Sequence, residues 1–178
     1  MSDPTKKIER VSLDLETTGD TPGCCILSIG ACTFNRKEVF YRRISHEDSL
    51  RYLKDDIETM RWWSKQDAEV RAEAFGGTIS MISALDDFSQ WFKSLNEGDT
   101  KNVQLWCRGS DFDGPILKYA YKAVDRKIPW DMRAGRCLRT LEDLLPHVKA
   151  PLRASKRHNA VDDAIYQAEH ASVLLAVL

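Results

Sequence analysis

The segment from Cys24 to Phe34, CCILSIGACTF, is apolar at both odd and even positions. A strand with one solvated face alternates apolar and polar side chains, whereas a strand covered on both faces does not. The segment therefore predicts a strand buried on both sides. Two further strands are predicted beside it, one beginning at Val11 and one in EVFYRRI at Glu38–Ile44, which follows at hairpin distance.

Helical periodicity follows these strands. The apolar spacing predicts helix from about Asp48 to Phe75 and again over Ile79–Leu95. The remaining predicted elements are a strand at 103–109, a helix at 114–124, a short extended piece and helix at 137–148, and a final helix from about Asn159. Strands first and then strands interleaved with helices predict an α/β fold with a mixed β-sheet flanked by α-helices. No repeat or linker is visible, so we expect a single domain over residues 1–178.

The composition is typical of a globular protein with a substantial core, at 178 residues, 43% hydrophobic and 30% charged. Lys and Arg total 26 against 27 Asp and Glu, which disfavours binding along a duplex but allows a short substrate at a metal site. No apolar run is long enough to span a membrane and no signal peptide is evident, so we expect a cytoplasmic protein without a membrane partner. We expect reduced core residues, not zinc ligands, at the five cysteines: Cys24, Cys25, Cys32, Cys107 and Cys137.

Acidic residues cluster at three predicted element ends. Asp14 and Glu16 occupy the polar positions of the strand VSLDLE, directly before a Thr-Thr-Gly turn. Two acids follow the 103–109 strand and two more begin the last helix: Asp111, Asp113, Asp162 and Asp163. Acids that converge raise one another's pKa values unless cations hold them, and oxygen-rich sites suit Mg²⁺ or Mn²⁺. Two such ions about 4 Å apart commonly assist in-line attack on a phosphodiester.

Three motifs carry a family resemblance. DLETTG at 14–19, GSDFDGPIL at 109–117 and HNAVDDA at 158–164 resemble the motifs of the DEDDh exonucleases, the DnaQ-like branch of the ribonuclease-H-like superfamily. TMRWWSKQDAEVR at 59–71 and CLRTLEDL at 137–144 further resemble a small bacterial and phage branch of mycobacterial-type exoribonucleases. The resemblance implies a ribonuclease-H-like fold and a metal-dependent 3′→5′ exonuclease, most similar to exoribonucleases, that releases nucleoside 5′-monophosphates.

The resemblance also implies roles for individual residues. Two Mg²⁺ or Mn²⁺ ions would be held by four carboxylates, and His158 would accept the proton of the attacking water; the carboxylates are Asp14, Glu16, Asp113 and Asp163. If Asn159 caps the last helix, His158 lies outside that helix and can reach over the site. The alternative for Asp113 is a helix cap alone, and Asp111 is the rival ligand.

Substrate contacts are predicted less directly. Thr17 and Thr18 follow Glu16 and are expected to contact the terminal nucleotide. Trp62 and Trp63 point about 100° apart on a helix, so one is expected in the core and the other can stack on a base. Arg157 belongs to the basic loop LRASKRH, which either binds phosphates or is merely solvated.

Other function classes remain open at this point. The expected partner is the 3′ end of RNA or single-stranded DNA, so an exodeoxyribonuclease is the nearest alternative; a homodimer is also allowed. A catalytically idle nucleic-acid-binding module is a second class, although the retained acids and histidine argue against it. A metal-binding regulatory protein without nuclease activity is a third class, supported only by the nearly neutral net charge of −1.

Overall fold

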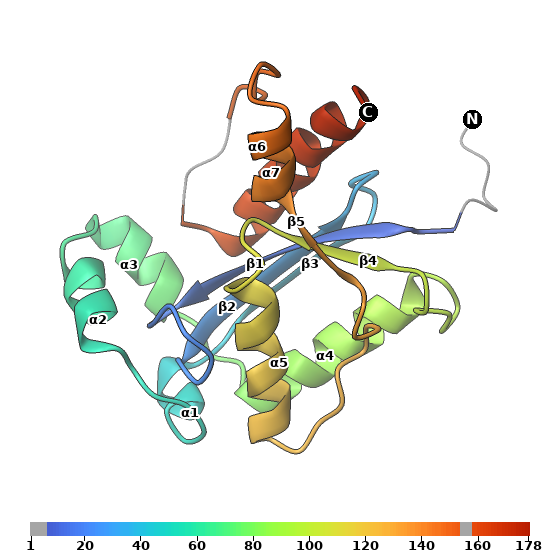
Figure 1. Ribbon diagram of the computed structural model, residues 1–178. Helices are drawn as coiled ribbons and strands as arrows, with labels where there is room; N and C mark the ends of the chain where they lie inside the picture. The colour runs from blue at the N-terminus through green and yellow to red at the C-terminus, as the bar shows by residue number, and fades with distance from the viewer. Residues whose placement is uncertain (1–6, 154–157) are drawn as a thin grey trace.

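A five-stranded mixed sheet forms the centre of the molecule in the computed structural model, which describes residues 7–153 and 158–178 (Figure 1). The strand order is β3-β2-β1-β4-β5. The first three strands pair antiparallel and the last two continue the sheet parallel to β1; their bounds are β1 Arg10–Thr17, β2 Ile26–Thr33, β3 Val39–Arg43, β4 Gln104–Cys107 and β5 Gly135–Cys137. The predicted mixed sheet is therefore confirmed, and the acid-bearing strand β1 is its middle strand.

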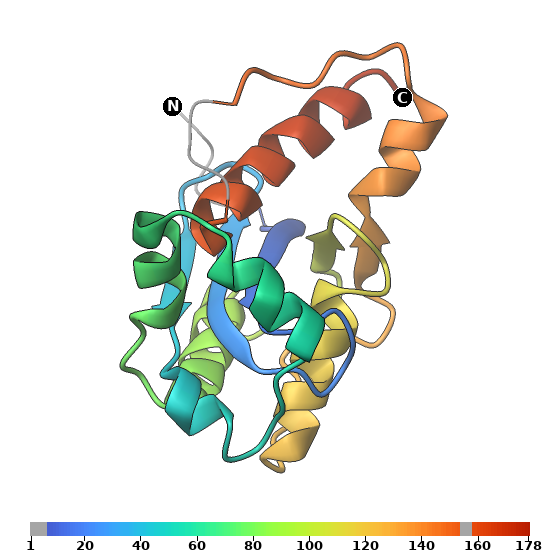
Figure 2. The same ribbon diagram turned by 90° about the vertical axis from the view of Figure 1, so that its left-hand side faces the viewer.

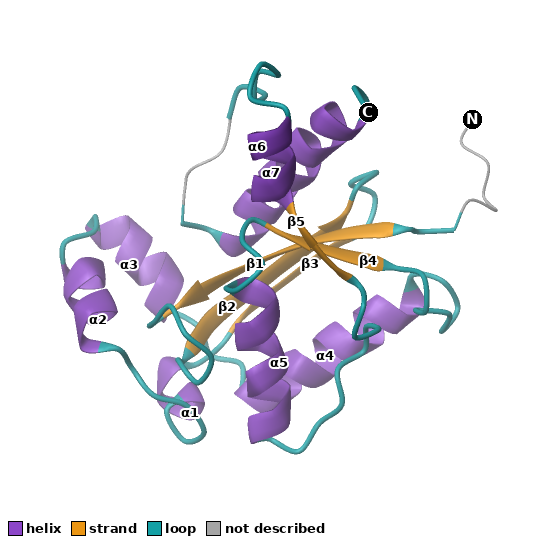
Figure 3. Ribbon diagram, in the orientation of Figure 1, coloured by secondary structure: helices purple, strands orange, loops and turns teal. Residues whose placement is uncertain are grey.

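Helices cover both faces of this sheet (Figures 2 and 3). On one side lie α4 (Met81–Ser94) and α5 (Asp113–Ala123), and on the other α6 (Leu138–Leu144) and α7 (Ala160–Leu175). The parity of β1 divides its side chains between these layers. Val11, Leu13 and Leu15 join the core cluster that includes α4 and α5, whereas Asp14 faces α7, where Gln167 donates a hydrogen bond to it.

The region predicted to be helical from about Asp48 to Phe75 is not continuous. It forms three short helices, which are α1 His46–Ser49, α2 Ile57–Ser64 and α3 Ala68–Phe75. An acidic cap explains the start of α2, where the N-cap Asp56 accepts a hydrogen bond from Thr59 N–H; Asp67 is the N-cap of α3 but makes no side-chain capping hydrogen bond. The apolar spacing continues across the connecting turns, so periodicity alone does not reveal them.

Helix α7 begins directly against the middle of β2. A Cβ at Gly30 would lie 2.1 Å from the carbonyl carbon of Ala160, so only glycine allows this approach. Asn159 is the N-cap, and its Oδ1 accepts a hydrogen bond from Asp162 N–H at 3.2 Å. The predicted cap is confirmed, and the close contact fixes the start of α7 over the sheet.

The cysteines agree with the prediction of reduced core residues. None is in a disulfide, and all are buried except Cys137, which is half-buried. Cys25 lies within 4.8 Å of ligand atoms on His46 and Asp55, and His46 Nε2 is 2.8 Å from an Asp55 oxygen. The absence of a zinc site stays a prediction. Among the described residues, no helix combines the length and apolar character needed to cross a bilayer.

Candidate active site

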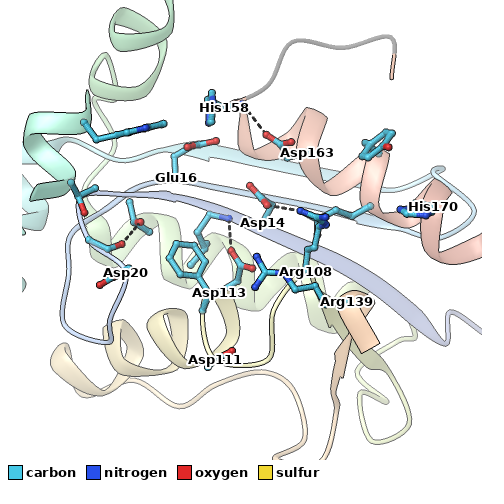
Figure 4. Close-up of a pocket in the computed structure, with 18 of the residues that line it drawn as sticks. Asp14, Glu16, Asp20, Arg108, Asp111, Asp113, Arg139, His158, Asp163 and His170 are labelled. Carbon is cyan, nitrogen blue, oxygen red and sulfur yellow. Dashed lines mark hydrogen bonds between the residues drawn. The ribbon is translucent and has the colours of Figure 1, made fainter. Parts of the chain in front are cut away.

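A cleft of about 720 Å³ opens where the end of β1 meets the beginnings of α5 and α7 (Figure 4). Its lining includes the acids of all three sequence motifs, together with His158. Helix α2 borders one end of the cleft, and residues of α6 border the other. Segments about a hundred residues apart in the sequence therefore meet in a single concave site.

Carboxylates from a strand and a helix lie closest together. Oxygens of Asp14, Glu16 and Asp163 are all within 4.8 Å of one another. Asp113 lines the same cleft from the first residue of α5, with only 2% of its surface exposed. Its Oδ1 accepts a hydrogen bond from Leu15 N–H at 3.0 Å, which ties α5 to β1.

The role of Asp113 as a helix cap is excluded by this geometry. The N-cap of α5 is Phe112, and no side-chain hydrogen bond caps the helix. The Asp113 carboxylate is directed toward β1 instead of toward its own helix end. Asp111 also lines the cleft, but it is exposed and its carboxylate contacts Ser110 Oγ at 3.4 Å.

Burial and mutual repulsion disfavour the ionised form of these acids. Burial raises the pKa of Asp14 well above its ordinary value, and the charges of Asp113, Glu16 and Asp163 raise it further. The same causes raise the pKa of Glu16 to about 8, and burial raises that of Asp113 to about 7. Four all-oxygen donors with suppressed ionisation fit Mg²⁺ or Mn²⁺, which would supply the missing positive charge.

His158 lies directly outside α7 and beside the acids. Its backbone φ of +64° is in the left-handed region, and its N–H donates to Asp163 Oδ2 at 3.0 Å. The imidazole ring lies edge-on to Trp62, with ring centres 5.1 Å apart, and is 6.5 Å from Trp63. The ring makes no hydrogen bond to any residue that the structure describes, so its nitrogens are available to a water or a substrate.

Trp62 and Trp63 differ in burial, as expected for neighbouring residues on a helix. Trp63 is 2% exposed, and its indole N–H donates to the carbonyl of Thr17 at 2.8 Å. Trp62 is 41% exposed and lines the cleft. Trp62 is therefore the one with an open ring face, and Trp63 is the core residue.

The predicted substrate contacts have mixed outcomes. Thr17 lines the cleft, although its hydroxyl already donates to the Gly19 carbonyl at 2.6 Å. Thr18 does not line the cleft and has no exposed surface, so the structure does not bring its side chain to the site, and its contact with the terminal nucleotide stays a prediction. Strand β1 ends at Thr17 and its register shifts between Glu16 and Thr17, so the alternation that places Asp14 and Glu16 in the cleft does not extend to Thr18. Arg157 lies outside the described residues.

Sequence reasoning missed several residues that line the cleft. Gln167 Nε2 donates to Asp14 Oδ1 at 2.6 Å, and Arg153 forms an ion pair with Asp163. Gln167 follows Asp163 by four positions, so the helical repeat could have placed both on one face. Arg108 and Arg139 come from segments whose proximity depends on the β4–β5 pairing, and no local pattern indicates it.

Comparison with known proteins finds a family match over most of the chain. The family model of the 3′-5′ exoribonuclease Rv2179c-like domain matches residues 9–175. The exodeoxyribonuclease of Enterobacteria phage T4 is 25% identical over 128 residues, which cover 64% of this chain and 56% of the phage enzyme. The match thus spans little more than half the length of that relative.

Solved structures show the same fold. The nuclease domain of 3′hExo, a DEDDh family member bound to rAMP, has a TM-score of 0.62 at 12% identity, covering 97% of this chain and 94% of that one. Cell-death related nuclease 4 has a TM-score of 0.56 at 13% identity, covering 96% and 64%. The ribonuclease-H-like fold expected from the motifs is confirmed. The chain belongs to the family of Rv2179c-like 3′-5′ exoribonuclease domains.

Proposed function

We propose that this chain, acting as a single domain, is a metal-dependent 3′→5′ exonuclease whose main substrate is RNA, and that it releases nucleoside 5′-monophosphates. The observation that carries the proposal is one cleft lined by four carboxylates from β1, α5 and α7 and by His158, whose ring makes no hydrogen bond to any described residue. The family match over residues 9–175 supports the same reaction.

The metal would be held by Asp14, Glu16, Asp113 and Asp163. Their oxygens are the ligands that Mg²⁺ and Mn²⁺ prefer, and their raised pKa values indicate a place where a cation is strongly favoured. When bound, a pair of such ions lowers the pKa of a water and stabilises the leaving 3′ oxygen. Because these ligands come from a strand and two helix starts, the sheet and its flanking helices determine their spacing.

The chain's own residues supply positioning and proton transfer. His158 accepts the proton of the attacking water, since its ring lies beside the acids and makes no hydrogen bond within the described chain. Gln167 orients Asp14 through its 2.6 Å hydrogen bond. Trp62 offers an exposed ring face for the terminal base, and Thr17 borders the same part of the cleft.

DNA is the second candidate substrate, and one observation favours it. The phage relative is an exodeoxyribonuclease, although it is only 25% identical and matched over 56% of its length. A ribose-specific enzyme must contact the 2′-hydroxyl, which is the group that distinguishes RNA from DNA. Direct competition between matched RNA and DNA strands would decide between the two substrates.

The test uses single strands of RNA and DNA labelled at the 3′ or the 5′ end. With Mn²⁺, a 3′ label should be released at once as a mononucleotide, while a 5′-labelled strand should shorten stepwise. Excess chelator should abolish both, and added Mg²⁺ or Mn²⁺ should restore them. Cleavage of a closed circular strand at the rate of a linear one would reveal an endonuclease and overturn the proposal.

A further inference from the structure

The two ends of the cleft differ in charge. In Figure 4 the metal-binding acids lie between Asp20 on one side and Arg108, Arg139 and His170 on the other. The Asp20 end is the one bordered by α2, so it combines an acid with the exposed ring of Trp62. The opposite end, which we call the basic end, contains Arg108, Arg139, Glu142 and His170.

Arg139 provides the least compensated positive charge of the basic end. It is exposed, and within the described chain no carboxylate forms an ion pair with it. Arg108 Nε is 3.1 Å from Glu142 Oε1, and the same oxygen is 3.2 Å from His170 Nδ1. Glu142 is thus shared between two partners, while the Arg108 side chain keeps 50% of its surface exposed.

An exonuclease substrate is asymmetric in the same way. The nucleoside at the 3′ end carries no phosphate beyond the bond that is cut, whereas every nucleotide on its 5′ side adds another negative charge. Metal ions at the centre of the site would have their charge largely offset by the carboxylates that hold them, so they cannot also neutralise these additional phosphates. The phosphate-free nucleoside fits the Trp62 and Asp20 end, and the phosphate-rich strand fits the basic end.

We propose that Arg139, together with Arg108, binds the backbone phosphates of the single strand 5′ of the bond that is cut. The ligand is the phosphodiester backbone of a single-stranded nucleic acid, read without regard to base sequence. Guanidinium groups suit this role because they form paired hydrogen bonds with phosphate oxygens. The proposal rests on the exonuclease function and adds the direction in which the strand crosses the cleft.

Substrate length provides the first test. A dinucleotide has only the bond that is cut, whereas an octanucleotide places further phosphates at the basic end. In R139Q and R108Q, kcat/KM for the octanucleotide should fall about tenfold per arginine, with a much smaller change for the dinucleotide. The matched control is R126Q. Arg126 is exposed and, like Arg108, is paired with a carboxylate, Asp86 at 3.1 Å, but it lies outside the cleft.

A second test measures binding without turnover. Affinity for a labelled octanucleotide would be measured in Ca²⁺ at several salt concentrations, for the wild type, R126Q and the double variant R108Q/R139Q. Loss of two phosphate contacts from a single strand should reduce the slope of log affinity against log salt by about 1.4. Neutral methylphosphonate linkages next to the cut bond should lower the affinity of the octanucleotide for the wild type. The same linkages should cause little further loss of affinity for the double variant.

The outcomes separate this proposal from the function on which it rests. If the wild type cleaves neither substrate with Mn²⁺, the exonuclease function itself fails. If the wild type is active but the arginine variants lose kcat/KM by the same factor for the dinucleotide and the octanucleotide, the arginines act at the bond that is cut. The proposed strand contact is then wrong. Equal salt slopes for R126Q and the double variant would also overturn the proposal.

Discussion

The carboxylates at the centre of the cleft and His158 at its edge are held in different ways. Asp113 is buried and Asp14 is half-buried, and each accepts a hydrogen bond from the protein, Asp14 from Gln167 at 2.6 Å and Asp113 from Leu15 at 3.0 Å. His158, at the start of α7, has a left-handed backbone and only ring contacts around its imidazole. Ligand positions are therefore set by the fold, while the proton acceptor is not tied by a hydrogen bond.

This difference suits the separate tasks of the carboxylates and the histidine. Ligands held in advance require little rearrangement when charge develops, which is the basis of electrostatic preorganisation. A base must approach the water and then pass its proton on, so a fixed hydrogen bond to the protein would hinder it. Substitutions of the carboxylates should thus disturb metal binding, and substitution of His158 should disturb the chemical step.

The largest effect is expected from Asp163→Asn. Loss of a charged ligand should lower the single-turnover rate about 10⁴-fold or more, ~5.5 kcal/mol, and weaken Mn²⁺ binding in a calorimetric titration. The neighbouring Asp162 is the matched control, because it starts the same helix but does not line the cleft. Asp162→Asn should change stability by ~1 kcal/mol or less through the helix dipole. Equal damage from both substitutions would contradict the ligand role of Asp163.

His158→Ala should have the next largest effect. We expect a rate loss of about 10²–10⁴-fold, with Mn²⁺ affinity retained, because the ring supplies a base and not a ligand. Activity should recover in part at high pH, where hydroxide needs no base. Rates from pH 6 to 10 and a Mn²⁺ titration would check both points. Loss of metal binding in this variant would place His158 among the ligands instead.

The buried acids make the metal-free protein sensitive to pH. Since folding raises the pKa of Glu16 from 4.5 to about 8, the folded state keeps a proton that the unfolded chain releases between these values. Stability should therefore fall as pH rises from about 5 to 8 in chelator. Mn²⁺ at a hundred times its Kd for pH 8 should restore ~2.7 kcal/mol at that pH, or about 5–10 °C in Tm, and the same concentration should restore less at pH 5.5, where protons compete for the ligands.

Thermal unfolding at pH 5.5 and 8 would measure this dependence. Glu16→Gln should flatten the pH dependence in chelator, because it removes the group that holds the extra proton. The control is Glu38→Gln, since Glu38 is exposed and far from the acids in the β2–β3 turn. A Tm in chelator that rises between pH 5.5 and 8, or an unchanged slope in Glu16→Gln, would show that these acids do not govern stability.

Local pattern was enough to predict much of this molecule. Alternation in β1 placed Asp14 on the face opposite Leu13 and Leu15, and the Asn159 cap placed His158 outside α7. Both inferences depend on neighbours within a few residues, where strand and helix periods are reliable. The same alternation fails at Thr18, which it would place beside Asp14 and Glu16, because the register of β1 shifts between Glu16 and Thr17 and Thr18 is fully buried.

Features set by distant packing could not be predicted. Helix geometry separated Trp62 from Trp63, but only the contact of Trp63 with the Thr17 carbonyl decides which one is buried. The basic end depends on β5 pairing with β4, which brings α6 beside the turn that carries Arg108. Such contacts join segments 30 residues or more apart, as in the 34-residue separation of Arg108 and Glu142.

A smaller effect on the carboxylates is expected at Gln167. Gln167→Leu removes the donor to Asp14 and should lower activity or Mn²⁺ affinity about 10–100-fold, as is typical of residues that orient metal ligands. Gln167→Glu should be worse, because a carboxylate cannot donate and adds negative charge. Gln90→Leu, at an exposed position of α4, is the control. Wild-type activity in Gln167→Glu would exclude the orienting role.

The smallest effect should come from the exposed tryptophan. Trp62→Leu removes a stacking surface and should raise KM about fivefold, the ~1 kcal/mol lower limit for one stacked base, while Trp62→Phe should lose less. Tyr119→Leu is the control, because Tyr119 is 43% exposed, close to the 41% of Trp62, but lies outside the cleft. The comparison would be repeated on a strand whose last nucleotide lacks its base. If Trp62→Leu impairs that strand as much as the intact one, Trp62 acts by supporting the His158 ring and does not stack on the base.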